Sequence, residues 1–352
     1  MGKVTLQSIA DRVGVSRMTV SNAFSRPDQL SADLRQRILE AADKLGYVGP
    51  DPAARALASG RTGAIGLLLT DELSEAFQDA VATEFLISVA DALTREGMGV
   101  TLLTSGAATT APSNYVPARD VAMDGAIVYI CDPASPDIAW LERRGLPVVA
   151  VDREPGPNAP SVNVDDRGGA RAAAQHLVDL GHTRVGIITL RSGFDVDDVP
   201  TENRPARERM LGWRDALEAA GIEPIVQAAR FHPHRDPKLS VETIARDLLD
   251  RPDRPTAVLC FSDAFAIATM QVARSLGLRV PEDLSVVGFD DSPLATASSP
   301  RLTTVHQEVA SKGSEAVRVL MSLMGPHRPE TVERVVLPTS LVVRDSTAPP
   351  PS

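Results

Sequence analysis

Apolar residues recur at helical spacing near the start of the chain. Leu6, Ile9 and Val13 would lie on one face of a helix, because residues three or four positions apart share a face. Thr5 is a good residue to cap the start of this helix, and Gly14 suits a left-handed residue at its end. The pattern therefore predicts a short first helix, preceded by its own cap.

Two more helices and a helical linker are predicted within the first 60 residues. Ser16 can cap a second short helix, and Ser31 a third, in which apolar residues recur between Leu34 and Leu45. Farther along, Asp51 can cap a helix that Gly60 ends. This last helix spans only about two turns, so it should need a partner to remain helical.

From residue 63 onward, apolar runs alternate with amphipathic helical segments. Strand-like runs include AIGLLLT, GAIVYI and LSVVGFD, and helical segments such as RGGARAAAQHLVDLG lie between them. Continuous apolar strands separated by helices are typical of parallel sheets that are covered on both faces. The order indicates an α/β body of two successive units, about 63–161 and 162–290, and the segments 302–323 and 334–345 would return across the junction.

The charge of the chain divides at the same place. Residues 1–62 hold nine Lys and Arg against six Asp and Glu, which gives +3, whereas the whole chain of 352 residues carries −10. A basic head on an acidic body confines attraction for phosphate to the head. With 43% hydrophobic residues, no apolar run of ~20 residues and no signal-peptide core, the sequence predicts a cytoplasmic protein with no membrane partner.

The residue types that bind metals or form disulfides are few and scattered. Cys131 and Cys260 lie inside apolar strand-like runs, far apart, so we interpret them as small buried hydrophobic residues. His232 and His234 form the one local histidine pair, without a third ligand nearby. We therefore expect no metal and no cofactor.

Two other classes of protein share parts of this pattern. An enzyme is disfavoured, because the chain has no Ser–His–Asp constellation, no GxxxxGKS and no GxGxxG. A periplasmic transport receptor would share the body but would need a signal peptide in place of the basic head. The head therefore separates these classes from a DNA-binding regulator.

The order of helix, glycine turn, short helix, loop and helix is that of a helix-turn-helix unit. The predicted second helix carries Arg17, Thr19, Ser21 and Asn22 on the side opposite Val20. Arg can read guanine and Asn can read adenine in the major groove, while Thr and Ser can reach phosphates. The alternative is an ordinary solvated helix face, but the preceding turn favours a recognition helix.

Specific runs of the chain resemble a known family. VTLQSIADRVGVSRMTVSNAF and SADLRQRILEAADKLGYV resemble the DNA-binding head of the LacI/GalR (lactose/galactose repressor) family, and PTAVLCFSDAFAIATMQVARSLGLRVPEDLSVVGFDD and PRLTTVHQE resemble its body. The resemblance covers residues about 4–345. It implies a helix-turn-helix head, a hinge helix, a core like that of periplasmic sugar-binding proteins, and a homodimeric repressor on a pseudo-palindromic operator of double-stranded DNA.

The combined reading predicts four segments: a head over 1–49, a hinge helix and linker over 50–61, an effector-binding and dimerisation core over 62–345, and a disordered tail over 346–352. Within the core it predicts a first lobe from 62–161 and 306–325, and a second lobe from 162–305 and 326–345.

The resemblance also assigns DNA-contacting positions. It places Arg17, Met18 and Asn22 where the family reads bases, and Leu57 where an apolar residue wedges into the minor groove. Together with the polar residues above, the predicted DNA contacts are Thr5, Ser16, Arg17, Met18, Thr19, Ser21, Asn22 and Leu57.

Effector contacts are predicted from strand ends, because ligands of two-lobed α/β bodies bind where strand C-termini face the cleft. Carboxylates and an Arg can hold hydroxyls, and an aromatic residue can cover a sugar ring. With Gln307 added by the resemblance, the predicted set is Asp152, Arg209, Phe231, Ser262, Asp290 and Gln307. Each could instead cap a helix or close a salt bridge, and Asp263, which begins a helix, fits that alternative best. The effector would be a small allosteric ligand, a sugar or a nucleoside.

Overall fold

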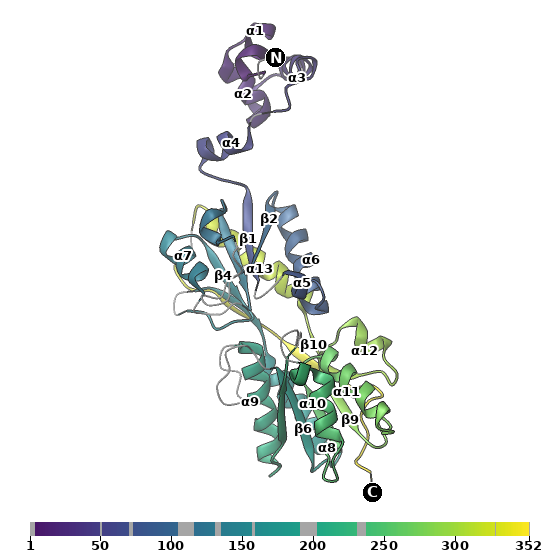
Figure 1. Ribbon diagram of the computed structural model, residues 1–352. Helices are drawn as coiled ribbons and strands as arrows, with labels where there is room; N and C mark the ends of the chain where they lie inside the picture. Colours follow the sequence, from purple (N-terminus) through teal and green to yellow (C-terminus); the bar gives the residue numbers. More distant parts are fainter. Residues whose placement is uncertain are drawn as a thin grey trace. The chain divides into compact units, whose positions relative to one another are not determined.

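The computed structural model describes residues 4–49, 51–69, 73–104, 116–130, 135–156, 159–190, 203–230, 237–327 and 329–351. The chain forms two compact units, Met1–Gly63 and Ala64–Ser352. Figure 1 shows a small helical unit and a larger α/β unit, and each is described here by itself. The predicted site residue Phe231, Cys131 and the pair His232 and His234 lie outside the described residues.

The first unit contains the predicted helices: α1 (Leu6–Val13), α2 (Arg17–Ser25), the 3-10 turn η1 (Pro27–Gln29), α3 (Ala32–Lys44) and α4 (Pro52–Ser59). The predicted caps are confirmed, because the side chains of Thr5, Ser16 and Ser31 each accept a hydrogen bond from a backbone N–H of the following turn. Gly14 ends α1 with φ 80°, a left-handed conformation that favours glycine.

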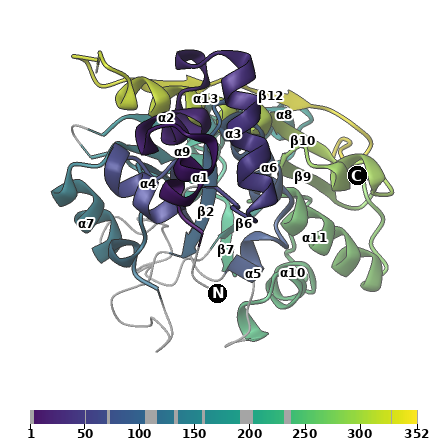
Figure 2. The same ribbon diagram turned by 90° about the horizontal axis from the view of Figure 1, so that it is seen from above.

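The helices α1, α2 and α3 lie against one another around a small core (Figure 2). Ile9, Val20 and Ile38 are completely buried at its centre. At its edge the rings of Phe24 and Tyr47 meet edge to face, with centroids 5.6 Å apart. In contrast, residues 53–59 of α4 include no buried residue.

The first lobe of the α/β unit is built on a six-stranded parallel sheet. Its strand order is β11 (Arg334–Leu337), β5 (Ser161–Val164), β4 (Val148–Val151), β3 (Gly125–Tyr129), β1 (Ala64–Leu69) and β2 (Gly99–Thr104). Its helical elements are α5 (Leu73–Ala76), α6 (Ala80–Arg95), η2 (Ala118–Asp120), α7 (Pro136–Arg144) and α13 (Val309–Met324). One apolar cluster includes Phe85 of α6 and Leu320 of α13, and a second, separate cluster includes Leu141 of α7.

The second lobe repeats the arrangement. Its sheet order is β12 (Thr339–Val342), β10 (Thr303–Gln307), β9 (Ser285–Asp290), β8 (Ala257–Cys260), β6 (Val185–Leu190) and β7 (Ile225–Ala229), with only β12 antiparallel to its neighbour. Its helical elements are α8 (Asp166–Asp179), α9 (Arg204–Ala219), η3 (Pro237–Leu239), α10 (Val241–Leu249), α11 (Asp263–Ser275) and α12 (Pro293–Ala297). One cluster holds Trp213 of α9 and another holds Phe265 of α11, as parallel strands covered on two faces require.

The chain crosses between the lobes three times, after β5, after β10 and after β11 (Figure 1). The first and third crossings are tied together: Asp165 N–H donates to Leu337 O at 2.9 Å, and the Thr339 hydroxyl donates to Asp165 O at 2.8 Å. Gly169 allows a close approach here, since a Cβ at this position would lie 2.6 Å from Thr339 Oγ1.

Three predicted lobe limits differ from the structure. The limit between residues 305 and 306 falls inside β10, so His306 and Gln307 belong to the second lobe and not to the first. The first lobe continues through Val164, because β5 belongs to its sheet. The segment 326–345 does not belong to the second lobe alone, because β11 pairs in parallel with β5 of the first lobe. The return segment is divided around Pro338, and only the strand after it joins the second lobe.

The predicted disorder of the tail is wrong for the described residues 346–351. Ser346 is fully buried, and its hydroxyl accepts from Thr303 N–H and donates to Val286 O. His182 Nε2 lies 2.9 Å from Ala348 O. Composition misleads here, because a stretch rich in Ser, Thr and Pro can still dock when its backbone groups find partners on a folded surface.

Cys260 is buried, and burial raises the pKa of its thiol to about 12, as expected for a small hydrophobic residue. In the described parts of the chain, no helix is long and apolar enough to cross a membrane, and no cluster of three His, Cys, Asp or Glu could hold a metal ion.

Candidate nucleic-acid interface and ligand cavity

The helix α2 has one face in the core and one face free. Val20 and Ala23 are buried, whereas Arg17 and Met18 point outward, with Met18 70% exposed. Arg17 has no hydrogen bond or ion pair with any described residue. Its guanidinium is therefore available to a partner outside the unit.

The other polar residues of this region have local partners. Ser16 Oγ accepts from Thr19 N–H at 3.0 Å and lies 2.8 Å from the Thr19 hydroxyl. Asn22 Nδ2 donates to Gln29 Oε1 at 3.2 Å, and its side chain is half-buried. Thr5 forms a capping box with Ser8 at the start of α1. These bonds give Thr5, Ser16, Thr19 and Asn22 local partners, and Ser21 lies half-exposed on α2.

The helix α4 presents an exposed apolar side chain. Asp51 caps it by accepting from the N–H groups of Ala53 and Ala54, and Gly60 ends it at φ 68°. Leu57 is 88% exposed. An exposed leucine on a helix of eight residues, with no buried side chain over residues 53–59, is unfavourable unless something covers it.

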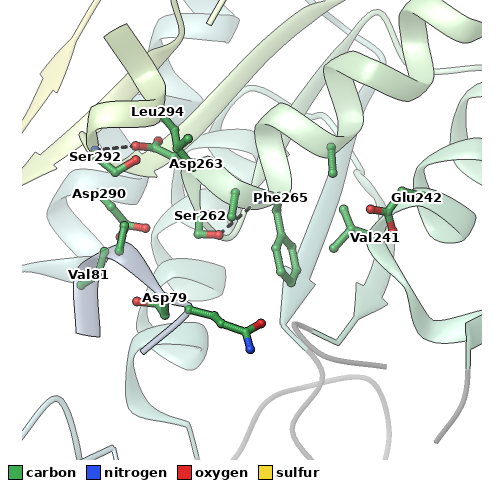
Figure 3. Close-up of a pocket in the computed structure, with 14 residues that line it drawn as sticks. Asp79, Val81, Val241, Glu242, Ser262, Asp263, Phe265, Asp290, Ser292 and Leu294 are labelled. Carbon is green, nitrogen blue, oxygen red and sulfur yellow. Dashed lines mark hydrogen bonds between the residues drawn. The ribbon is translucent and has the colours of Figure 1, made fainter. Parts of the chain in front are cut away.

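A cavity of about 340 Å³ lies between the two lobes of the α/β unit (Figure 3). The first lobe contributes the start of α6, and the second contributes residues from α10, α11, α12 and the end of β9. Its polar lining includes four carboxylates and two hydroxyls, from Asp79, Glu242, Asp263, Asp290, Ser262 and Ser292. Of the predicted effector residues, the structure brings Ser262 and Asp290 to this cavity.

Two lining residues also hold the local structure. Ser262 caps α11 by accepting from Phe265 N–H at 3.3 Å. The Asp263 carboxylate accepts from the Thr304 hydroxyl at 2.5 Å and from Ser292 N–H at 2.7 Å, and burial raises its pKa to about 6. Asp263 therefore does not cap α11, whose cap is Ser262; its carboxylate instead links the start of α11 to β10 and to the start of α12.

Arg209 lies outside the residues that line the cavity. Its guanidinium is 3.6 Å from the centroid of the Phe289 ring, and its Nε donates to Asp166 Oδ1 at 3.0 Å. It also donates to Phe261 O at 2.6 Å and lies 3.4 Å from Asp290 Oδ1. Arg209 therefore supports Asp290 from behind. Burial raises the pKa of Asp290 well above its usual range, and the charge of Arg209 opposes that rise.

The remaining predicted residues are joined to Asp290 by a buried hydrogen-bonded chain. Gln307 Nε2 donates to Asp290 Oδ1 at 2.7 Å, and Lys312 Nζ donates to Gln307 Oε1 at 2.8 Å and to Asp152 Oδ2 at 2.5 Å. Asp152 directly follows β4 and Asp290 is the last residue of β9. Their φ angles are positive, at 49° and 116°. Strained residues of this kind cluster at ligand sites and switches.

The polar residues of this region that were not predicted include Asp79, Glu242, Ser292 and Lys312. Lys312 interrupts the apolar face of α13, and a lysine at helical spacing from Ala316 and Leu320 is a signal that could have been noticed. Asp79 lines the cavity and caps α6 by accepting from Ala82 N–H at 2.6 Å. The rule that ligands meet strand ends does not reach Asp79, because this residue begins a helix.

Known proteins with a similar sequence support this arrangement. Residues 5–49 match the family described as bacterial regulatory proteins, lacI family, and residues 174–347 match the periplasmic binding protein-like domain. The chain is 39% identical over 336 residues to the HTH-type transcriptional regulator IpsA of Corynebacterium glutamicum, covering 91% of each chain. It is 33% identical over 350 residues to the HTH-type transcriptional regulator CelR of Thermobifida fusca, covering 97% of this chain and 98% of that protein.

Solved structures show the same fold. A complex of the transcriptional regulator CelR with cellobiose matches with a TM-score of 0.70 and 29% identity, covering 98% of this chain and all of that one (100%). The lac repressor dimer bound to operator and the anti-inducer ONPF matches with a TM-score of 0.79 and 24% identity, covering 99% and 100%. The predicted α/β architecture, with a helical head and two parallel-sheet lobes, is thereby confirmed.

Proposed function

Since the chain belongs to the LacI family of DNA-binding transcriptional regulators, we propose that it is a cytoplasmic repressor that binds a pseudo-palindromic operator as a homodimer. A small polar effector bound between the lobes would control it. The relatives are named as transcriptional regulators, which confirms the prediction that the chain is not an enzyme.

The proposal that this protein binds operator DNA through α2 rests on the exposed face of that helix. Arg17 is exposed without a partner at the start of this helix, as expected of a side chain that reaches a base edge. Met18 and Asn22 would contact neighbouring bases, and Ser16 and Thr19 would contact phosphates, with Thr5 and Ser21 beside them. On the operator, Leu57 would insert between base pairs in the minor groove, which would cover its exposed side chain.

The DNA proposal is tested with an operator selected from random duplexes by the wild-type protein. Arg17→Ala should weaken operator binding by about 1–3 kcal/mol and relax the base preference at one position of each half-site. Arg37→Ala, which removes an exposed arginine from α3, is the matched control. Unchanged base preference in Arg17→Ala, measured by repeating the selection, would contradict the assignment.

The carboxylates of the cavity carry the proposal for the effector. Asp79 and Asp290 face it from opposite lobes, and ionised carboxylates accept hydrogen bonds from ligand hydroxyls or N–H groups. We therefore infer a hydroxyl-rich ligand, a sugar or a nucleoside. By analogy with the family we also propose that its binding releases DNA. Asp152 and Gln307 would support this site through their bonds to Lys312 and Asp290.

A thermal-shift screen of sugars and nucleosides on the full chain tests the effector class. A true ligand at ~100 times its Kd should stabilise the protein by about 2.7 kcal/mol. Asp290→Asn should abolish that shift, and Asp253→Asn, on the surface of the same lobe, should retain it. Stabilisation that persists in Asp290→Asn would place the ligand elsewhere.

A further inference from the structure

Lys312 occupies a position where the pattern of its helix calls for an apolar residue. The buried face of α13 includes Val309, Ala316 and Leu320, and Lys312 lies on it with 1% of its side chain exposed. The chain has four lysines (Lys3, Lys44, Lys238 and Lys312) among 36 basic residues, and of the three that the structure describes, Lys44, Lys238 and Lys312, only Lys312 is buried. A buried ion pair is seldom more stabilising than apolar packing, so its presence indicates a role other than stability.

The contacts of Lys312 join the two lobes. Its ammonium donates to Asp152, at the end of β4 in the first lobe, and to Gln307, the last residue of β10 in the second lobe. Gln307 in turn donates to Asp290, which lines the cavity. The Lys312 side chain therefore lies two hydrogen bonds away from Asp290, the residue that would contact the proposed effector.

The hydrogen bonds from Lys312 to Gln307 and from Gln307 to Asp290 have defined donors and acceptors. An ammonium has donors only, so the amide oxygen of Gln307 must face Lys312. The amide NH2 group is then directed at Asp290, where it stabilises the ionised carboxylate. Without Lys312 the amide could turn over, and its oxygen would then face the carboxylate.

We propose that Lys312 is a positioning residue for ligand binding: it orients Gln307 so that the Gln307 amide NH2 group holds the Asp290 carboxyl group at the cavity, and it anchors that arrangement to Asp152 of the first lobe. The connection to ligand binding rests on the proposed function of the cavity. The connection from Lys312 to Asp290 can be tested without any ligand.

The ligand-free test follows the lysine ammonium signals by NMR in full-length protein labelled with 15N at lysine Nζ. Lys312→Arg identifies the Lys312 signal by its loss. We expect Asp290→Asn to shift the Lys312 signal, because the two residues communicate through Gln307, and to leave Lys44 and Lys238 unchanged. In a Gln307→Leu background, Asp290→Asn should no longer move it. A Lys312 signal that ignores Asp290→Asn, or responds equally without Gln307, would overturn the proposal.

The second test measures ligand binding by calorimetry. Its first probes are cellobiose and ribose, followed by any sugar that the thermal-shift screen identifies. Lys312→Met and Gln307→Leu should each weaken binding about tenfold, and the double variant should be no weaker than either, because both remove the same support. Lys238→Met is the control.

Because Lys312→Met leaves Asp152 buried without its partner, Asp152→Asn/Lys312→Met is measured beside it. Additive losses, or none, would contradict the positioning role. If no sugar binds the wild type, the effector proposal fails and the NMR result still decides the role of Lys312.

Discussion

At the scale of single residues, Arg209 shows how one buried cation serves several acids. Its guanidinium contacts Asp166 and Asp290 and stacks on the ring of Phe289. Burial raises the pKa of Asp166 as well as that of Asp290, and the charge of Arg209 opposes both rises. Arg209 thus acts on the cavity indirectly, through Asp290, which lines it.

Removing this arginine should therefore affect folding more than binding alone. Arg209→Ala should lower the free energy of unfolding by about 3–5 kcal/mol, because two buried carboxylates lose their partner. Arg207→Ala, on the same helix, breaks only partly exposed pairs with Glu154 and Glu208 and should cost about 1 kcal/mol or less. Urea unfolding of both variants measures the difference. Equal losses would show that the buried pairs do not stabilise the core.

Sequence reasoning reached only part of the cavity lining. Of the four carboxylates that line it, only Asp290 is in the predicted set, and Arg209, predicted as a ligand contact, lies behind Asp290 and does not line the cavity. Asp152, Ser262 and Asp290 follow strands, and the rule that ligands meet strand ends finds them. Lys312 and Arg209 act from helices, and their partners are 160 and 43 positions away along the chain. Such contacts depend on how helices pack on the sheets, and local patterns do not contain that information.

At the scale of elements, α4 stands apart from the other helices of its unit. It spans eight residues and has a cap at each end, and none of its side chains over residues 53–59 is buried, so its own hydrogen bonds are its main support. Its caps could be predicted because they depend on neighbouring residues, unlike the docking of residues 346–351, which depends on distant strands.

We expect α4 to be marginally stable in the free protein and to become ordered on the operator. Amide hydrogen exchange should be fast over 52–59 and slow over 32–44 without DNA, and slow in both with operator. Leu57→Ala should prevent the protection of α4 on the operator and weaken operator binding, while affinity for random DNA, which comes mainly from phosphates, should barely change. Equal losses on operator and random DNA would indicate that Leu57 only supports the fold of the first unit.

At the scale of the whole molecule, two histidines make stability depend on pH. Burial lowers the pKa of His176 and of His182, and both contact the docked C-terminal segment, at Thr347 and Ala348. In the unfolded chain a histidine titrates near pH 6.5. Below that pH the histidines of the unfolded chain bind protons, whereas those of the folded protein remain neutral to a lower pH. The contribution of the two histidines to the free energy of unfolding is therefore complete above about pH 6.5 and is lost as the pH falls.

The free energy of unfolding should therefore decrease less between pH 7.5 and 5.5 in His182→Gln than in the wild type. Comparing the two proteins is necessary because Asp263, whose pKa is raised to about 6, acts in the opposite direction: its contribution grows as the pH falls. His327→Gln, at an exposed histidine, serves as the control. Parallel pH profiles for the wild type and His182→Gln, measured by urea unfolding, would show that His182 does not carry this dependence.

The three crossings between the lobes limit how the α/β unit can move. A single connecting strand would allow torsion and bending, but here two of three crossings are hydrogen-bonded to each other at Asp165, Leu337 and Thr339. Such a joint resists torsion and leaves bending about one axis as its softest degree of freedom. Every ligand that closes the cavity must then drive the same path, and ligands can differ only in how far along that path they hold the lobes.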